Sequence, residues 1–186
     1  AAGRTFRLSS GAFWQVHKEA ANVLTKSVFE AAELLELDPT KPVLDLYAGA
    51  GLFSATMAAK YASTSFTAVE NNKQAVADGS KSAIDLSNLK FEKSDVLQYL
   101  RIASAKPGSF DTVVLDPPRS GAAGKVIEQL VKLRPRNIVY VACDPIALAR
   151  DLKPLIEGGY ELKTLRAFDL FPHTHHVEAV ASLVRK

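Results

Sequence analysis

The chain has 186 residues, 47% of them hydrophobic and 23% charged, which predicts one globular domain and excludes a disordered or low-complexity protein. It carries 23 Lys and Arg against 20 Asp and Glu, and the net charge of +3 is compatible with a nucleic-acid partner without indicating one. The single cysteine, Cys143, excludes an internal disulfide, an all-cysteine zinc site and an iron–sulfur cluster within this chain.

Hydrophobic periodicity predicts a long first helix over Phe13–Leu35, with Ser9, Ser10 and Gly11 before it as cap and turn residues. Short runs of branched apolar residues then alternate with helical stretches. The predicted strands are Val43–Tyr47, Ser65–Val69, Leu89–Glu92, Thr112–Leu115 and Ile138–Val141, and the helices that follow them are Leu52–Tyr61, Lys73–Leu86, Val96–Ala103, Gly124–Leu133 and Ile146–Glu157.

This alternation predicts an α/β fold in which helices cover both faces of a parallel sheet. The last third of the chain differs, because Tyr160–Phe168 and Val177–Val184 are two strands with only a short connection between them. Such a connection cannot cross over the sheet, so this pair should be antiparallel. We therefore expect a seven-stranded sheet with five parallel strands and a terminal antiparallel hairpin.

Ligands of an open parallel sheet bind at the carboxyl ends of its strands, so the residues that follow each strand are candidates for a site. Gly49 and Gly51 follow the first strand, where they allow a tight turn and a close approach of the backbone to a ligand. Glu70 follows the second strand, ~20 residues on, and suits the hydroxyls of a ribose. A third glycine of the dinucleotide pattern is missing, which favours an adenosine cofactor without phosphates.

Two further acidic residues follow the third and fourth strands. Asp95 is placed either to meet an adenine amino group or to cap a helix. Asp116 opens the segment Asp116-Pro117-Pro118-Arg119, whose two prolines predict a stiff loop that holds a side chain in place. A plain turn remains the alternative for this segment.

Cys143 follows the fifth strand and precedes a helix. A lone cysteine is usually a small buried hydrophobe, but a helix N-terminus lowers the pKa of a thiol, which makes Cys143 a candidate nucleophile. An antiparallel last strand places its beginning, and with it Glu178, at the same edge of the sheet. A metal site made by His173, His175 and His176 is disfavoured, because no cysteine or carboxylate pattern completes a set of ligands.

Taken together, these segments resemble the RNA uracil-C5 methyltransferase family, which uses S-adenosylmethionine, and the resemblance runs from about Phe6 to Lys186. Its motifs are Phe13-Trp14-Gln15-Val16, Leu44-Asp45-Leu46-Tyr47-Ala48-Gly49-Ala50-Gly51-Leu52-Phe53, Val69-Glu70, Leu115-Asp116-Pro117-Pro118-Arg119, Tyr140-Val141-Ala142-Cys143-Asp144-Pro145, Asp169-Leu170-Phe171-Pro172 and His176-Val177-Glu178.

The resemblance implies a Rossmann-like methyltransferase sheet and a role for each matching residue. Cys143 would be the nucleophile that adds to C6 of uracil, and Glu178 the general base. The residues implied to contact S-adenosylmethionine or to hold its site together are Gln15, Tyr47, Glu70 and Asp116, with Gly49 and Gly51 shaping the turn; no metal is implied.

The implied reaction is methyl transfer to C5 of a uridine in RNA, with ribosomal RNA favoured and transfer RNA possible. We expect residues 1–186 to form one catalytic domain, with the leading helix region 1–40 packed on it. The chain starts at Ala1 in mid-pattern, so we expect an amino-terminal RNA-binding domain to be absent from it. A monomer is favoured, and because neither a membrane span nor an export leader is evident, we expect a cytoplasmic protein.

Two alternatives remain open. A methyltransferase that acts on an exocyclic base amine also places an acidic residue before two prolines, but it needs no thiol and usually has an aromatic residue where Arg119 stands. The second is a cofactor- or RNA-binding module without activity of its own, against which the presence of both Cys143 and Glu178 argues. A nicotinamide oxidoreductase is disfavoured by the incomplete glycine pattern.

Overall fold

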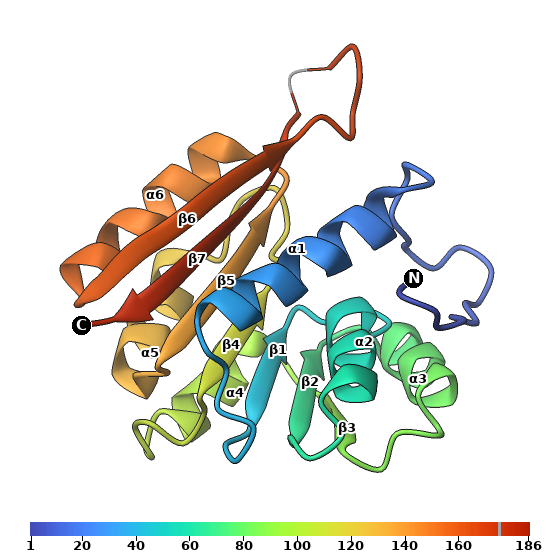
Figure 1. Cartoon of the computed structure of the whole chain (residues 1–186), viewed down its shortest axis with the longest axis horizontal. Coiled ribbons are helices and arrows are strands. Elements are labelled where there is room, and N and C mark those ends of the chain that lie inside the picture. The colour runs from blue at the N-terminus through green and yellow to red at the C-terminus, as the bar shows by residue number, and fades with distance from the viewer. Residues whose placement is uncertain (175) are drawn as a thin grey trace.

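The computed structural model describes residues 1–174 and 176–186 and contains one seven-stranded sheet in the order β3-β2-β1-β4-β5-β7-β6 (Figure 1). The first five strands are parallel to one another, and β7 pairs antiparallel with both β5 and β6. The predicted sheet is thus confirmed. Its strands are β1 Val43–Leu46, β2 Phe66–Glu70, β3 Leu89–Lys93, β4 Thr112–Leu115, β5 Asn137–Ala142, β6 Tyr160–Phe168 and β7 Glu178–Arg185.

Helices cover both faces of the sheet, because successive side chains of a strand point to opposite sides. On one face, Leu44 and Leu46 pack among apolar residues of α4, α5 and α6, and on the other face Val43 packs among residues of α1 and α2. Figure 1 shows α1 running across its face of the sheet. The helices are α1 Ala20–Leu34, α2 Leu52–Lys60, α3 Lys73–Ser82, α4 Val96–Ala103, α5 Gly124–Leu133 and α6 Pro145–Glu157.

The first helix begins later than predicted, at Ala20 instead of Phe13. The prediction counted Phe13 and Val16 on the apolar face of that helix, but these side chains are 77% and 81% exposed. Residues 13–19 form an irregular segment ahead of the helix, and Ser9 to Gly11 are therefore not its cap. The third helix also ends early, at Ser82 instead of Leu86, and a turn follows it.

The position of the site follows from the strand order. β1 lies inside the sheet, with β2 on one side and β4 on the other, so the chain reverses its direction of travel across the sheet at this point. The connections after β1 and β4 diverge there, and ligands of such folds bind in the crevice outside the carboxyl ends of these strands.

Among the described residues, none of the helices has the length and the apolar composition that a membrane span requires.

Asn88 joins the end of α2 to the start of β2 and provides a test of this packing. Its side-chain amide nitrogen donates to the carbonyls of Ala58, Tyr61 and Thr64 at 3.0, 3.2 and 2.9 Å. We expect Asn88→Ala to lower the free energy of unfolding by about 1–3 kcal/mol, because these carbonyls lose their donor. Urea denaturation measures this, with the exposed neighbour Ser87→Ala as control. Equal stability of the two variants would contradict the account.

Candidate functional site

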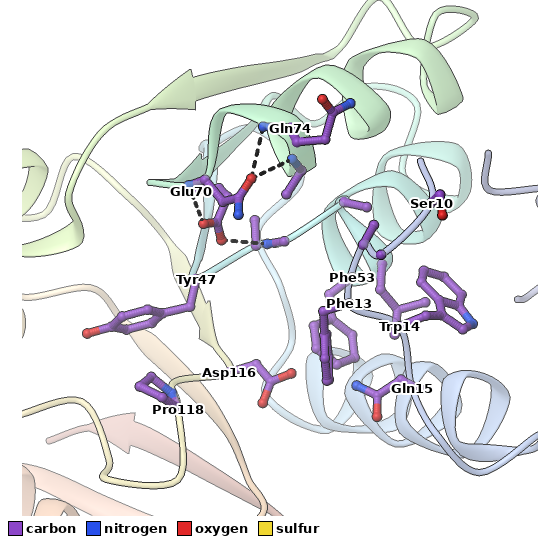
Figure 2. A pocket seen from close by; sticks show the side chains of 18 residues that line it. Ser10, Phe13, Trp14, Gln15, Tyr47, Phe53, Glu70, Gln74, Asp116 and Pro118 are labelled. Atoms are coloured by element: carbon purple, nitrogen blue, oxygen red, sulfur yellow. Dashed lines mark hydrogen bonds between the residues drawn. The ribbon is translucent and has the colours of Figure 1, made fainter. Parts of the chain in front are cut away.

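A cavity of about 640 Å³ opens at the carboxyl ends of β1, β2 and β4 (Figure 2). This volume is within the range of small-molecule sites. Figure 2 shows Glu70 on the side of the cavity toward α3, with Asp116 and Gln15 on the side toward α1. Five of the residues predicted to contact a cofactor line this cavity: Gln15, Tyr47, Gly49, Glu70 and Asp116.

The turn after β1 forms the floor of the cavity. The Gly49 amide donates to Oε2 of Glu70 at 2.9 Å, and the Asn72 amide donates to Oε1 of the same carboxylate at 2.7 Å. Gly51 lies behind the cavity and caps α2 with a φ of 82°, and a Cβ there would lie 2.6 Å from the Phe91 ring. Only glycine fits this position, so Gly51 shapes the turn without lining the cavity.

A strap of residues 10–15 forms the opposite wall and was not foreseen as a structural unit. Ser9 anchors the strap, because its amide and its hydroxyl both donate to Asp78 of α3, each at 2.8 Å. Gln74, which lines the cavity, donates its side-chain amide to the Ser9 hydroxyl at 2.7 Å. Sequence reasoning missed this anchor because Asp78 lies 69 residues away and carries no local signal.

The two aromatic residues of the strap, Phe13 and Trp14, differ in how they pack. Trp14 packs on Phe6 with 5.0 Å between the ring centroids, which ties the strap to the preceding segment. Phe13 borders the cavity, yet most of its side chain is exposed. Phe13 lies in an irregular segment ahead of α1, and Figure 2 shows its side chain among those that line the cavity.

The structure brings Cys143, Glu178 and Asp116 together next to the cavity, at the same carboxyl-end edge of the sheet. β5 and β7 pair with Ala142 opposite Ala179, so the next position of this antiparallel register sets Cys143 opposite Glu178. Asp116 follows β4, the other neighbour of β5, and the charges of Glu178 and Asp116 both act on the Cys143 thiol. Residues that are distant in sequence therefore share one small region.

This region is acidic and partly shielded from water. Burial raises the pKa of Glu178, which is only 5% exposed. Burial, with the charges of Glu178 and Asp45, raises the pKa of Asp116 well above its usual value. Burial also raises the pKa of Asp45 to about 7. A raised pKa makes a carboxylate a stronger base, as general base catalysis requires.

The expected lowering of the Cys143 pKa is wrong. Burial, followed by the charges of Glu178 and Asp116, raises the pKa of this thiol, while the Arg119 guanidinium lowers it by a smaller amount. The helix N-terminus next to Cys143 favours the thiolate, but burial and the carboxylates that other strands bring close to the thiol outweigh it. The half-buried thiol is therefore harder to ionise than an exposed cysteine.

Two further predicted positions lie apart from this site or outside the described residues. Asp95 caps α4 by accepting from the Gln98 amide at 2.9 Å and does not line the cavity, so its contact with an adenine stays a prediction. His175 lies outside the described residues. Within residues 1–174 and 176–186, no group of three or more His, Cys, Asp or Glu side chains could hold a metal ion.

The chain is similar to known proteins over almost its whole length. Residues 3–186 match the family described as tRNA (Uracil-5-)-methyltransferase. A protein of Streptomyces avermitilis named uncharacterized RNA methyltransferase is 46% identical over 184 residues, or 97% of this chain and 41% of the relative. A Thermotoga maritima protein of the same name is 38% identical over 97% of this chain and 40% of the relative. The chain thus spans about two fifths of the length of these relatives.

Solved structures extend the comparison. Pyrococcus abyssi tRNA (uracil-54, C5)-methyltransferase, crystallised with S-adenosyl-L-homocysteine, aligns with a TM-score of 0.76 and 31% identity over 94% of this chain and 40% of that chain. Precorrin-6y C5,15-methyltransferase of Geobacter metallireducens has a TM-score of 0.69 at 15% identity over 97% and 95% of the two chains, which shows the fold alone. With the match extending from residue 3 to residue 186, the chain belongs to the tRNA (uracil-5-)-methyltransferase family.

Proposed function

We propose that this chain transfers a methyl group from S-adenosylmethionine to C5 of a uridine in RNA, through a covalent bond between Cys143 and C6 of uracil. The observation that carries the proposal is the register of β5 and β7, which sets the single cysteine opposite the buried Glu178 beside the cavity. Family membership and relatives named RNA methyltransferases support it.

S-adenosylmethionine fits the residues that line the cavity. The Glu70 carboxylate, held by two backbone amides, suits the hydroxyls of a ribose, and a carboxylate in the cavity wall disfavours a phosphate group. Gln15, Tyr47 and Gly49 would complete the contacts. When bound, this cofactor supplies a methyl group on a cationic sulfonium.

The reaction needs one nucleophile and one base. C5 of uracil is a weak nucleophile, and addition of the Cys143 thiolate to C6 converts the ring to an enolate that is electron-rich at C5. Once C5 is methylated, it still carries its hydrogen. Glu178 removes that proton, the electron pair re-forms the C5–C6 double bond, and the S–C6 bond breaks with its electrons returning to Cys143. The uracil ring must leave its stack in the RNA to reach this edge of the sheet, which favours uridines in single-stranded regions.

The class of RNA that carries the target uridine is a separate part of the proposal. The family description and the Pyrococcus abyssi protein name tRNA, whereas the two curated relatives are named only RNA methyltransferases. The preference for ribosomal RNA stays a prediction. We propose a uridine in an accessible RNA loop as the target, and transcripts of both classes belong in the assay.

Nucleoside analysis tests the proposed function. The chain is incubated with methyl-labelled S-adenosylmethionine and with tRNA or ribosomal RNA transcripts, and the RNA is digested to nucleosides. We expect the label in 5-methyluridine. Label in a methylated adenine or guanine amine would contradict the proposal in favour of an amine methyltransferase, and absence of label despite cofactor binding would contradict activity of this chain alone.

Cys143→Ala separates chemistry from cofactor binding. Because Cys143 is outside the cavity lining, we expect this variant to bind S-adenosylmethionine with unchanged affinity while methylation falls to background. Isothermal titration calorimetry and the nucleoside assay measure the two quantities. Methylation near the wild-type rate would exclude Cys143 as the nucleophile.

Glu178→Gln should stop the reaction after methyl transfer, because an amide does not remove the C5 proton. We expect a covalent protein–RNA adduct to accumulate, visible on a denaturing gel, and the exposed Glu161→Gln of β6 serves as control. In the wild type, burial raises the pKa of Glu178, so the base is lost as pH falls through that raised pKa, at a higher pH than for an exposed glutamate. Normal turnover by Glu178→Gln would place the base elsewhere.

Ser9→Ala tests the anchor of the strap. This substitution removes the hydroxyl that donates to Asp78 and accepts from Gln74. We expect the Kd for S-adenosylmethionine to rise about fivefold, the equivalent of ~1 kcal/mol for one lost hydrogen bond. Ser80→Ala is the matched control, because it removes an exposed hydroxyl from α3, the helix that carries Asp78 and Gln74. Equal affinities of the two variants would show that the anchor does not support cofactor binding.

A further inference from the structure

The loop between β4 and α5 is fixed by a buried hydrogen-bond network outside the cavity. The Ala122 amide donates to Oδ2 of Asp151 at 2.7 Å, and the Tyr140 hydroxyl donates to the same oxygen at 2.7 Å. Arg150 donates to Oδ1 of that carboxylate at 2.9 Å and to the Ser120 carbonyl at 2.6 Å. Asp151 is only 2% exposed, so its carboxylate holds the loop from within the fold.

Gly121 shows how closely the loop and the network pack. Its φ of +81° lies in the left-handed region, and a Cβ at this position would collide with the side chains of Arg150 and Asp151. Tyr47, which lines the cavity, donates its hydroxyl to the Ala122 carbonyl at 3.3 Å. The loop is therefore held on one side by α6 and on the other by the wall of the cavity.

The helix that carries this network begins beside the candidate nucleophile. Cys143 directly precedes Asp144, which caps α6 by accepting from the Ala147 amide at 2.7 Å. Asp151 lies about two turns further along the same helix. The same helix, α6, thus begins next to the thiol and holds the loop through Asp151.

The loop brings opposite charges to that thiol. Its start is fixed by the sheet, where the Asp116 amide donates to the Leu46 carbonyl at 3.3 Å. The exposed Arg119 lies between this point and the Asp151 network. Three charges act on Cys143: Glu178 from β7 and Asp116 from the start of the loop raise its pKa, and Arg119 lowers it.

We propose that Asp151 is a positioning residue, which fixes the loop so that the Arg119 guanidinium stays near Cys143 and sets the reactivity of the thiol. The catalytic meaning of this positioning rests on the proposed uridine methylation. The positioning itself is measurable on the thiol without RNA or cofactor.

Alkylation by iodoacetamide as a function of pH, followed by intact mass, tests this because the chain has a single cysteine. We expect Asp151→Asn to react about threefold more slowly at neutral pH and with a midpoint at higher pH, because the Arg119 charge is no longer held in place. The direction of the shift in the alkylation midpoint is informative, because the loss of a negative charge alone would lower the pKa of the thiol. Arg119→Gln should give the same change, and the double variant should react no more slowly than Arg119→Gln.

Two variants make the test independent of the folding of Asp151→Asn. Gly121→Ala displaces the loop without removing the carboxylate and should also slow alkylation. Glu157→Gln removes an exposed charge from the same helix and should leave alkylation unchanged. A wild-type profile in Gly121→Ala, or full additivity of Asp151→Asn and Arg119→Gln, would overturn the proposal.

Methylation kinetics connect the positioning to catalysis. We expect Asp151→Asn to lower kcat while the KM for S-adenosylmethionine stays unchanged, because Asp151 lies outside the cavity lining. An unchanged kcat would overturn the catalytic consequence of the positioning. If the wild type makes no 5-methyluridine, the proposed function fails, whereas the alkylation profiles still decide whether Asp151 positions the loop.

Discussion

The register between β5 and β7 is the constraint on which the candidate site depends. β7 enters the sheet antiparallel between β5 and β6, so its first residue, Glu178, meets the last residues of β5. The runs 137–142 and 178–183 are buried throughout, so a slip of one residue would force the closely packed side chains on both faces of the sheet to repack. The same burial that stabilises the sheet therefore sets Glu178 opposite Cys143.

The cost of this arrangement is electrostatic. Asp45, Asp116 and Glu178 crowd carboxyl groups into a region with little water, and burial raises the pKa of each. The thiol of Cys143 shares this environment, in which the neighbouring Arg119 opposes the carboxylates. A buried carboxylate with a raised pKa binds a proton more strongly than an exposed one, which suits a general base. The strap and the loop after β4 then fix the two sides of the site around it.

Much of the site could be predicted from the sequence, because strand ends in a parallel sheet meet at one edge and local patterns reveal them. The turn at Gly49, the acid at Glu70 and the meeting of Cys143 with Glu178 all follow from that rule. The start of α1 could not be predicted, because Val16 fits a helical period although its side chain is exposed. The contacts of Asp78 and the sign of the Cys143 pKa shift depend on residues brought in from other elements, which no local pattern records.

The most direct measurement is the intact mass of this chain after mixing with S-adenosylmethionine and RNA that contains 5-fluorouridine. Fluorine at C5 is not removed as a proton, so the covalent intermediate should be trapped. The account predicts a stable protein–RNA adduct whose attachment maps to Cys143. An unmodified protein mass, under conditions in which the same chain binds cofactor and converts uridine to 5-methyluridine, would contradict the role of Cys143 as the nucleophile.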